Sequence, residues 1–315
     1  MTIAMPSLPK ALDPTQLRLA NHFLLLQCFC QTLVRTNEQG DMVSDAAESW
    51  TFSDQARTVT FKLKPDLKFP DGSKLTAADF ANSLSRHFTP QTKSAVGGYL
   101  KKIAAEKEPF TAVDAQTLKI RLRHSYGPLL HLLAMPGFCA LKESKSTVGG
   151  FMGSGPLAVE ELTESTIRFH RNLNYKGNVE INDIVVQAIP ALNESLSRVD
   201  WDKIDIAIGI PPEMLETQNI PGFVATPLES LAIAHLYFNT EKRPDLDPQL
   251  RRLISTQLST LKSEFKGKFY EPIGGAYVEG RSAAQVVSMV CWFRYSIASP
   301  IDERMSRLTN KVYRF

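Results

Sequence analysis

Residues 50–84 of this chain, WTFSDQARTVTFKLKPDLKFPDGSKLTAADFANSL, decide its fold. Within them, Val59, Phe61 and Leu63 alternate with polar side chains, which is the period-2 pattern of a half-buried β-strand. The pattern predicts a strand over Thr58–Leu63 with its apolar side chains on one face. The core expected around this strand consists of large apolar residues: Trp50, Val59, Phe61, Leu63, Phe69 and Phe80.

A tight turn and a capped helix follow this strand. Pro70-Asp71-Gly72 combines residues that favour turns. Thr76, with Asp79 three positions later, forms the capping-box pattern of a helix N-terminus. Beyond the cap, apolar residues recur at four-residue spacing and form one stripe on the helix: Phe80, Leu84 and Phe88. The stretch therefore predicts strand, turn and helix, and it requires no catalytic group.

The order of these residues resembles the bacterial extracellular solute-binding proteins of family 5, the dipeptide-, oligopeptide- and nickel-binding receptors of ABC importers. Ten residues stand in register with the signature of that family: Trp50, Phe61, Leu63, Phe69, Asp71, Gly72, Thr76, Ala77, Asp79 and Ser83. A lone Asp-Gly pair would mean nothing, whereas ten matches in one short stretch are specific.

Further segments carry the same resemblance over about residues 2–254, and none is found beyond Val278. The segments that match family motifs are Leu12-Asp13-Pro14, Gly153-Ser154-Gly155-Pro156, Asp205-Ile206-Ala207 and the run HLYFN at residues 235–239. One departure concerns hydrogen-bonding groups. Cys30 and Gln31 stand where the family carries a tyrosine and a glutamate.

Length and composition bound the class of protein. A chain of 315 residues is long enough for about two domains with sizeable cores. A net charge of +3 favours neither nucleic acid nor an anionic membrane surface as a partner. The longest apolar runs, residues 23–29 and 283–293, are shorter than the roughly 20 residues that span a bilayer. No secretory signal is visible at the N-terminus, which fits a removed leader as well as a chain that stays inside the cell.

No motif for catalysis, metal or nucleotide binding stands out. The six histidines have no metal-ligand spacing. In the glycine-rich segment 149–156, Pro156 and the following leucine stand where a phosphate loop needs lysine and a hydroxyl residue. The cysteines form no metal pattern, so we expect them to be small core hydrophobes: Cys28, Cys30, Cys139 and Cys291. We therefore expect no enzymatic activity, no cofactor and no metal.

The resemblance implies a binding site instead. In the family a ligand lies between lobes, against a loop after the Leu-Asp-Pro motif and against strand edges, where backbone hydrogen bonds hold an extended peptide. Counted along this chain, those edges comprise eight candidate ligand-binding residues: Arg18, Leu19, Ala20, Gly209, Ile210, Tyr237, Phe238 and Asn239. Structural roles compete at some of them, since Arg18 suits a solvated helix and Phe238 suits a strand core.

The fold class that the resemblance implies is α/β, a type II periplasmic-binding-protein-like fold of family 5 with mixed β-sheets flanked by helices. Residues 1–35 and 150–238 would form lobe one, which binds ligand. Residues 36–149 would form lobe two, a smaller inserted α/β lobe. Residues 239–315 would be the remnant of a third lobe, largely missing, plus an unmatched tail.

The implied function is the substrate-binding component of an ABC transporter, which captures peptides or similar small solutes by hinge closure. Its partners would be the ligand and the membrane permease of the transporter, without nucleic acid, and the chain would be a monomer. The resemblance places it in the periplasm or outside the cell at the membrane. Two alternatives stay open: a cytosolic ligand-sensing module of a regulator, and a truncated paralogue without function.

Overall fold

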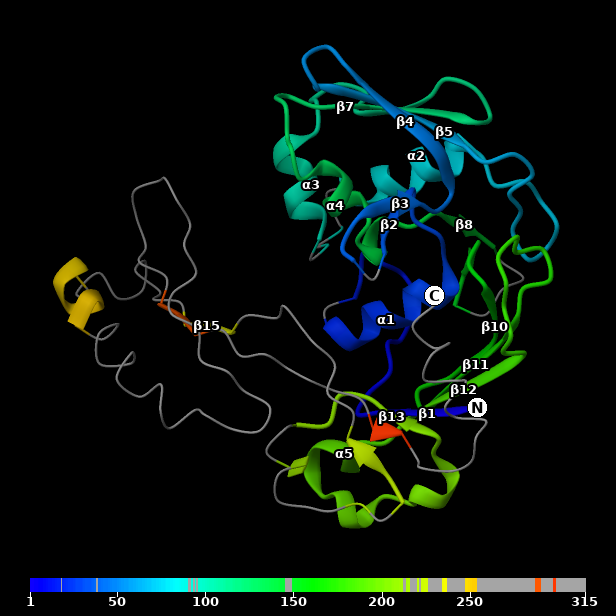
Figure 1. Ribbon diagram of the computed structural model, residues 1–315, viewed down its shortest axis with the longest axis vertical. Coiled ribbons are helices and arrows are strands. Elements are labelled where there is room, and N and C mark those ends of the chain that lie inside the picture. The colour runs from blue at the N-terminus through cyan, green and yellow to red at the C-terminus, as the bar shows by residue number, and fades with distance from the viewer. Residues whose placement is uncertain are drawn as a thin grey trace. The chain divides into compact units, whose positions relative to one another are not determined.

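The computed structural model of the chain describes residues 1–17, 19–37, 39–89, 92, 94, 96–144, 149–211, 214–215, 220, 222–225, 234–236, 247–253, 287–289 and 297–298. Only the backbone is described for residues 20–21, 224–225, 234–236, 287–289 and 297–298. The described residues fall into two compact units, the first comprising Met1–Ile189 and the second beginning at Pro190 (Figure 1).

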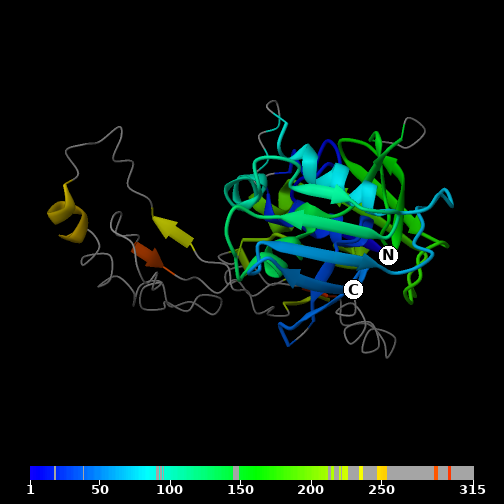
Figure 2. The ribbon, with the colours of Figure 1, turned by 90° about the horizontal axis from the view of Figure 1, so that it is seen from above.

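The stretch that begins at Trp50 contributes most of an edge strand and one central strand to an antiparallel four-stranded sheet in the first unit (Figures 1 and 2). The strands follow the order β4 (Ala47–Ser53), β5 (Thr58–Leu63), β7 (Thr117–Arg121) and β6 (Phe110–Ala112). Phe61 lies opposite Leu118, so side chains from both central strands share one face. The strand predicted over Thr58–Leu63 is confirmed.

Helices cover the apolar face of this sheet (Figure 1). They are α2 (Ala77–Arg86), α3 (Gly97–Ile103), α4 (Leu129–Leu133) and the 3-10 helix η1 (Pro136–Phe138). The N-terminus of α2 is where the capping box predicted it. The Thr76 N–H and hydroxyl both donate to Asp79 Oδ2, each at a distance of 2.7 Å. These hydrogen bonds fix the first turn of the helix.

One hydrophobic cluster fills the space between the sheet and its helices, and its buried members all lie between Leu33 and Ala140. Five of the six expected core residues are fully buried: Val59, Phe61, Leu63, Phe69 and Phe80. Trp50 is only partly buried, because β4 is an edge strand and leaves part of the ring in solvent. Its ring still lies 6.4 Å from the ring of Phe61.

A second sheet of the first unit is mixed. Its strands follow the order β10 (Leu157–Leu162), β11 (Thr166–Arg171), β12 (Asp183–Ala188) and β1 (Thr2–Met5). β1 runs parallel to β12, whereas β10, β11 and β12 are antiparallel to one another. Met5 and Phe169 are fully buried in this part of the unit. The expected class, α/β with mixed sheets flanked by helices, is confirmed.

Helix α1 (Ala20–Phe29) and two short hairpins connect these sheets. The hairpins are β2 (Val34–Thr36) with β3 (Met42–Ser44), and β8 (Leu141–Glu143) with β9 (Phe151–Gly153). The nearly apolar run of residues 21–33 predicts a buried helix over its whole length, but the helix ends at Phe29. Cys30 adopts an extended conformation, and its N–H closes the last turn on the Leu26 carbonyl at 2.8 Å.

The second unit contains shorter elements. Its helical turns are α5 (Ala191–Glu194), η2 (Leu196–Arg198) and η3 (Trp201–Lys203). Its strands are β13 (Ile206–Ala207), β14 (Val224–Ala225), β15 (Ala234–Leu236), β16 (Val287–Met289) and β17 (Ile297–Ala298). β13 and β14 each pair antiparallel with β17, and β15 pairs antiparallel with β16. The division of the chain into three lobes stays a prediction.

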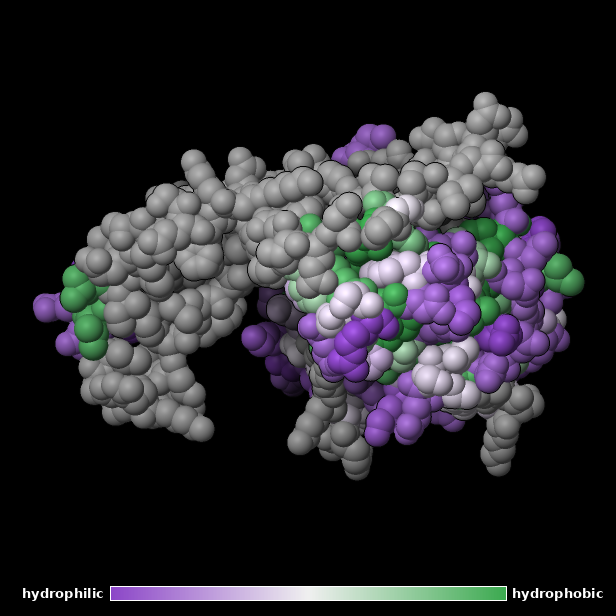
Figure 3. All heavy atoms as spheres, turned by 90° about the horizontal axis from the view of Figure 1, so that it is seen from below, coloured by the Kyte–Doolittle hydropathy of each residue, from purple (hydrophilic) through white to green (hydrophobic). Residues whose placement is uncertain are grey.

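The described surface is polar with scattered apolar side chains. On the face in Figure 3, hydrophilic residues surround smaller apolar areas. Leu173, the most exposed large apolar side chain among the described residues, has 87% of its area in solvent. Among the helices that the structure describes, none has the length and apolar character needed to cross a membrane.

Candidate functional site

The first predicted ligand edge lies at the start of α1. Leu19 precedes the helix in an extended conformation and has 48% of its area exposed. Ala20 is the first residue of the helix. Arg18, the third residue predicted for this edge, lies outside the described residues. The edge therefore has an exposed extended residue, of the kind that an extended peptide can pair with through its backbone.

The second predicted edge follows β13 in the second unit. Gly209 has a φ of +84°, in the left-handed region that favours glycine, and Ile210 has only 2% of its area exposed. A ligand at Ile210 would therefore meet the main chain rather than the buried side chain. The third predicted edge, Tyr237, Phe238 and Asn239, lies outside the described residues.

Asp13 fixes the loop that leads to the first edge. Its Oδ1 accepts the Thr15 N–H at 3.0 Å and the Thr15 hydroxyl at 2.9 Å. Its Oδ2 accepts the Gln16 amide at 3.1 Å and the Arg86 guanidinium at 2.7 Å. Asp13 is 2% exposed and Arg86 is 24% exposed, so the carboxylate of this ion pair between the loop and α2 is shielded from water.

The charge state of Asp13 follows from these partners. Burial on its own raises the pKa of the carboxyl, but hydrogen bonds from Arg86 and Thr15 and the positive charge of Arg86 outweigh it and lower the pKa. Arg86 is held from a second side as well, because its guanidinium lies 4.3 Å from the centre of the Phe151 ring. The sequence motif marked Asp13 as a turn residue and gave no sign of this pair, whose members are 73 positions apart.

Gln31, which stands where the family carries a glutamate, lies beside a buried carboxylate. Gln31 donates from its amide to Asp45 Oδ1 at 3.2 Å, and Thr32 donates its N–H to Asp45 Oδ2 at 2.9 Å. Burial raises the pKa of Asp45, and these donors oppose the shift. A glutamate at position 31 would place a second carboxylate against Asp45. Glutamine supplies a donor instead, which the neighbouring acid requires.

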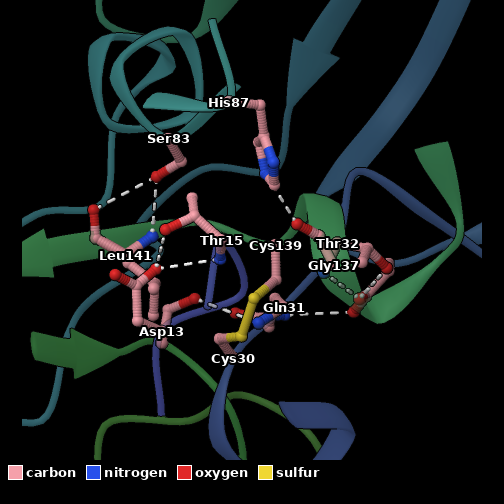
Figure 4. Close-up of a disulfide and its surroundings, with 12 residues drawn as sticks. Asp13, Thr15, Cys30, Gln31, Thr32, Ser83, His87, Gly137, Cys139 and Leu141 are labelled. Atoms are coloured by element: carbon pink, nitrogen blue, oxygen red, sulfur yellow. Dashed lines mark hydrogen bonds between the residues drawn. A yellow bond between two sulfur atoms is a disulfide. The ribbon is translucent and has the colours of Figure 1, made fainter. Parts of the chain in front are cut away.

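The cysteines correct an expectation. Cys30 and Cys139 form a disulfide with a Cα–Cα distance of 5.7 Å, so they are not the unpaired core residues that the sequence predicted (Figure 4). Their separation of 109 positions left no local pattern to find. Cys28 is the free cysteine among the described residues, and burial raises the pKa of its thiol to about 11. Cys291 lies outside the described residues.

The glycine-rich segment that resembled a family motif serves close packing. A Cβ atom built on Gly153 would lie 2.1 Å from the Phe29 carbonyl oxygen, and one on Gly155 would lie 2.6 Å from the Cys30 nitrogen. Only glycine allows this approach to the end of α1. Between them, Ser154 accepts the Gln31 N–H with its hydroxyl at 3.3 Å. The segment is therefore a close structural contact with the end of α1.

Several signature residues likewise stabilise the fold. Ser83 Oγ accepts the Leu141 N–H at 2.9 Å and donates to the Leu141 carbonyl at 3.2 Å, which ties α2 to β8 (Figure 4). Asp71 accepts the Lys142 ammonium at 3.0 Å near the same hairpin. These polar contacts join the lobe built on the signature stretch to the segment that leaves it.

His87 is buried near the end of α2, and its surroundings make the stability of the protein depend on pH. Its Nε2 lies 2.9 Å from the Gly137 carbonyl and its Nδ1 lies 2.7 Å from Ser94 Oγ, an arrangement that suits the neutral tautomer with hydrogen on Nε2. Burial lowers the pKa of His87 from 6.5 to about 4. The unfolded chain therefore binds a proton more readily than the native state as the pH falls from 6.5 to about 4.

We expect this imidazole to remove up to roughly 3 kcal/mol of stability over that pH range. Urea unfolding at a series of pH values measures it. His87→Gln retains an amide donor for Gly137 and does not titrate, so its stability should fall less steeply with acid. The matched control is His124→Gln at an exposed position, which should keep the slope of the unmodified protein. Equal slopes for all three proteins would contradict the assignment.

The sequence and the fold of the chain have counterparts in known proteins. Residues 41–256 match the family described as bacterial extracellular solute-binding proteins, family 5 middle. This match spans more than half of the chain, and the chain belongs to that family. The resemblance drawn from the signature stretch is thereby confirmed.

Particular members are similar to the chain over about half of their own length. The periplasmic murein peptide-binding protein MppA of Escherichia coli K12 is 27% identical over 272 residues, which cover 78% of this chain and 50% of that protein. The probable D,D-dipeptide-binding periplasmic protein DdpA of the same strain is 29% identical over 268 residues, with the same two coverages. The solved structure of the E. coli murein tripeptide-binding protein MppA superposes with a TM-score of 0.71 at 25% identity, covering 86% of this chain and 58% of that one.

Proposed function

We propose that this chain binds peptides, or small solutes similar to them, as part of the substrate-binding component of an ABC importer. The observation that carries the proposal is the family match over residues 41–256, together with similarity to proteins named for murein peptides and for D,D-dipeptides. The membrane permease of the importer would be its macromolecular partner. No covalent chemistry is required, since capture needs only binding and closure.

The ligand would be held by main chain. Leu19 is exposed and extended at one predicted edge, and at Gly209-Ile210 the buried isoleucine side chain leaves the backbone as the contact. Backbone hydrogen bonds do not discriminate among side chains, so this mode of binding suits a receptor for peptides of many sequences. Arg18 and the segment 237–239 belong to the proposed site by the family resemblance.

The disulfide supports a location outside the cytosol. Cys30 and Cys139 form a structural disulfide. Such bonds persist in oxidising compartments such as the periplasm, whereas cytosolic reductants keep cysteines reduced. The relatives named above are periplasmic proteins. This observation favours a periplasmic or extracellular receptor over the cytosolic sensing module that the sequence left open.

Calorimetry with a mixed library of di- to pentapeptides tests the proposal. The contacts proposed here are main-chain hydrogen bonds, and each contributes little net free energy because it replaces a hydrogen bond to water. We expect saturable one-to-one binding with a dissociation constant no tighter than about the high micromolar range. Single amino acids should give no saturable heat. Absence of peptide binding at millimolar concentration would contradict the function, and submicromolar binding would contradict the expected affinity.

Two glycine variants separate binding from stability. Gly209 and Gly222 have similar left-handed φ values, +84° and +79°, so an alanine at either position strains the backbone by a similar amount. Gly209→Ala distorts a predicted ligand edge and should weaken peptide binding. Gly222→Ala lies outside the predicted site and should leave the affinity unchanged. Equal affinities in both variants would remove Gly209-Ile210 from the site.

A further inference from the structure

The disulfide lies where three segments of the first unit meet. These segments are residues 29–32 at the end of α1, residues 139–141 after η1, and residues 153–155 at the end of β9; we call them the junction. Cys30 is 4% exposed and Cys139 is 1% exposed, so the bond is enclosed by protein. Figure 4 shows it close to Gln31 and to the segment of Gly137.

Backbone hydrogen bonds run between all three segments of the junction. The Ala140 N–H donates to the Gln31 carbonyl at 2.9 Å, and the Gly155 N–H donates to the Phe29 carbonyl at 2.9 Å. Gln31 in turn donates its N–H to the hydroxyl of Ser154. The disulfide therefore adds a covalent bond to segments that already pair through their main chains.

The loop closed by the bond contains all buried members of one core except Ala140. The buried members of the hydrophobic cluster run from Leu33 to Ala140, and the two half-cystines stand at positions 30 and 139. The covalent loop thus contains all of the four-stranded sheet and its covering helices. The chain enters this folded body beside Cys30 and leaves it beside Cys139. The disulfide therefore joins the two connecting segments that would have to bend if a hinge were located here.

Other contacts join residues 33–140 to the rest of the first unit, which carries α1. The buried ion pair of Asp13 and Arg86 links the loop before α1 to α2. The Asn174 amide donates to the Pro70 carbonyl at 3.0 Å, linking the loop after β11 to the turn of the signature stretch. A hinge normally has few contacts across it and is free to change its backbone angles. This boundary has neither property.

We infer that the Cys30–Cys139 disulfide is a covalent clasp that makes the core of residues 33–140 and the body carrying α1 move as one rigid part. The edge at Leu19-Ala20 begins α1 and so belongs to that rigid part. Cys28 lies two positions from the bond, and with its pKa raised by burial it stays protonated and does not attack the disulfide in the native state.

The pairing is tested first, on the unmodified chain. Trypsin leaves Cys28 and Cys30 in one peptide, because its sites flank them at Arg18 and Arg35. Chymotrypsin cleaves after Phe29 and separates them. A non-reducing digest with both enzymes should yield Cys139 linked to the fragment that begins at Cys30. Finding Cys139 unlinked, or linked to Cys28, would overturn the inference whether or not any variant folds.

The clasp itself is tested by hydrogen exchange on Cys30→Ala/Cys139→Ala, with Cys28→Ala as the matched control. Residues 58–63 and 117–121, in the centre of the sheet, report any general loss of stability and serve as the internal reference. Exchange in the junction should accelerate about tenfold or more beyond that reference in the double variant, because local opening becomes possible there. Cys28→Ala should change neither region.

Acceleration by the same factor in junction and reference would overturn the clasp, since the bond would then act only through the unfolded chain. Unchanged exchange in the junction would overturn it too. If the double variant does not fold, the unmodified protein is reduced with a phosphine and alkylated under native conditions. Its hydrogen exchange is then compared with that of the oxidised protein in the junction and in the reference segments. Equal acceleration in both, or no change in the junction, would again overturn the clasp.

Discussion

Replacing Phe61 by alanine is expected to lower the free energy of unfolding by about 3–5 kcal/mol. Phe61 is fully buried in the middle of β5 and lies opposite Leu118 on one side and Trp50 on the other. Truncation removes the ring from a closely packed cluster that is covered by helices. The loss combines the transfer free energy of the ring with the cavity left behind.

The midpoint of urea unfolding, monitored by tryptophan fluorescence and by circular dichroism, measures this effect. Phe52→Ala is the matched control, since Phe52 lies on the neighbouring edge strand with 47% of its area exposed. The control should change stability by no more than about 0.5 kcal/mol. A midpoint that does not move for Phe61→Ala would show that the strand does not face the core.

Replacing Asp13 by alanine is expected to lower the free energy of unfolding by about 3 kcal/mol, because it removes a buried carboxylate that pairs with a guanidinium and accepts several hydrogen bonds. Arg86 loses its ion pair, and Thr15 and Gln16 lose hydrogen bonds. Arg86 keeps 24% of its side-chain area exposed, which holds the cost at the lower end for a broken buried pair. The loop toward Leu19 should also lose its fixed conformation.

The exposed pair of Glu161 and Arg168 provides the control. Both side chains are nearly half exposed, so Glu161→Ala should cost less than about 1 kcal/mol. The pH dependence adds a second check. Because the folded pKa of Asp13 is lowered, its stabilisation is present above the unfolded value and is lost as the pH falls through the folded value. The difference between Asp13→Ala and the unmodified protein should therefore shrink in acid; a cost no larger than that of Glu161→Ala at neutral pH would contradict the account.

Local sequence patterns predicted the elements of the signature stretch well. The strand over Thr58–Leu63 has the predicted bounds, and Thr76 and Asp79 make the cap that their spacing indicated. Both features depend on interactions within a few residues, which periodicity and spacing record directly. Phe61 and Phe80 could be assigned to the core for the same reason, since the alternating and four-residue patterns fix which face of each element is buried.

Contacts between distant parts of the chain could not be predicted in this way. Cys30 and Cys139 are brought together by the complete fold of the lobe between them, and Asp13 meets Arg86 only because α2 packs beside the first loop. The end of α1 was misjudged for a related reason. The residues after Phe29 are apolar or neutral and favour continued helix, but the hydrogen bonds that Gln31 makes to Ser154 and Asp45 draw them into the junction.

The candidate site was predicted through the family resemblance rather than through local chemistry. Of its residues, Leu19 lies exposed at a helix start, whereas Ile210 has a buried side chain. A site that binds main chain leaves little trace in side-chain type, so composition alone would not have found either. The signature residues that drew attention, such as Asp79 and Ser83, stabilise the lobe.

The central claim is that this chain captures peptides through its main-chain edges, and hydrogen exchange with and without a saturating peptide tests it most directly. The account predicts slower exchange on binding at residues 18–20, 209–210 and 237–239, with residues 58–63 and 117–121 unchanged. Slowing confined to the outer face of the four-stranded sheet, or no change at the three edges with peptide bound, would contradict it.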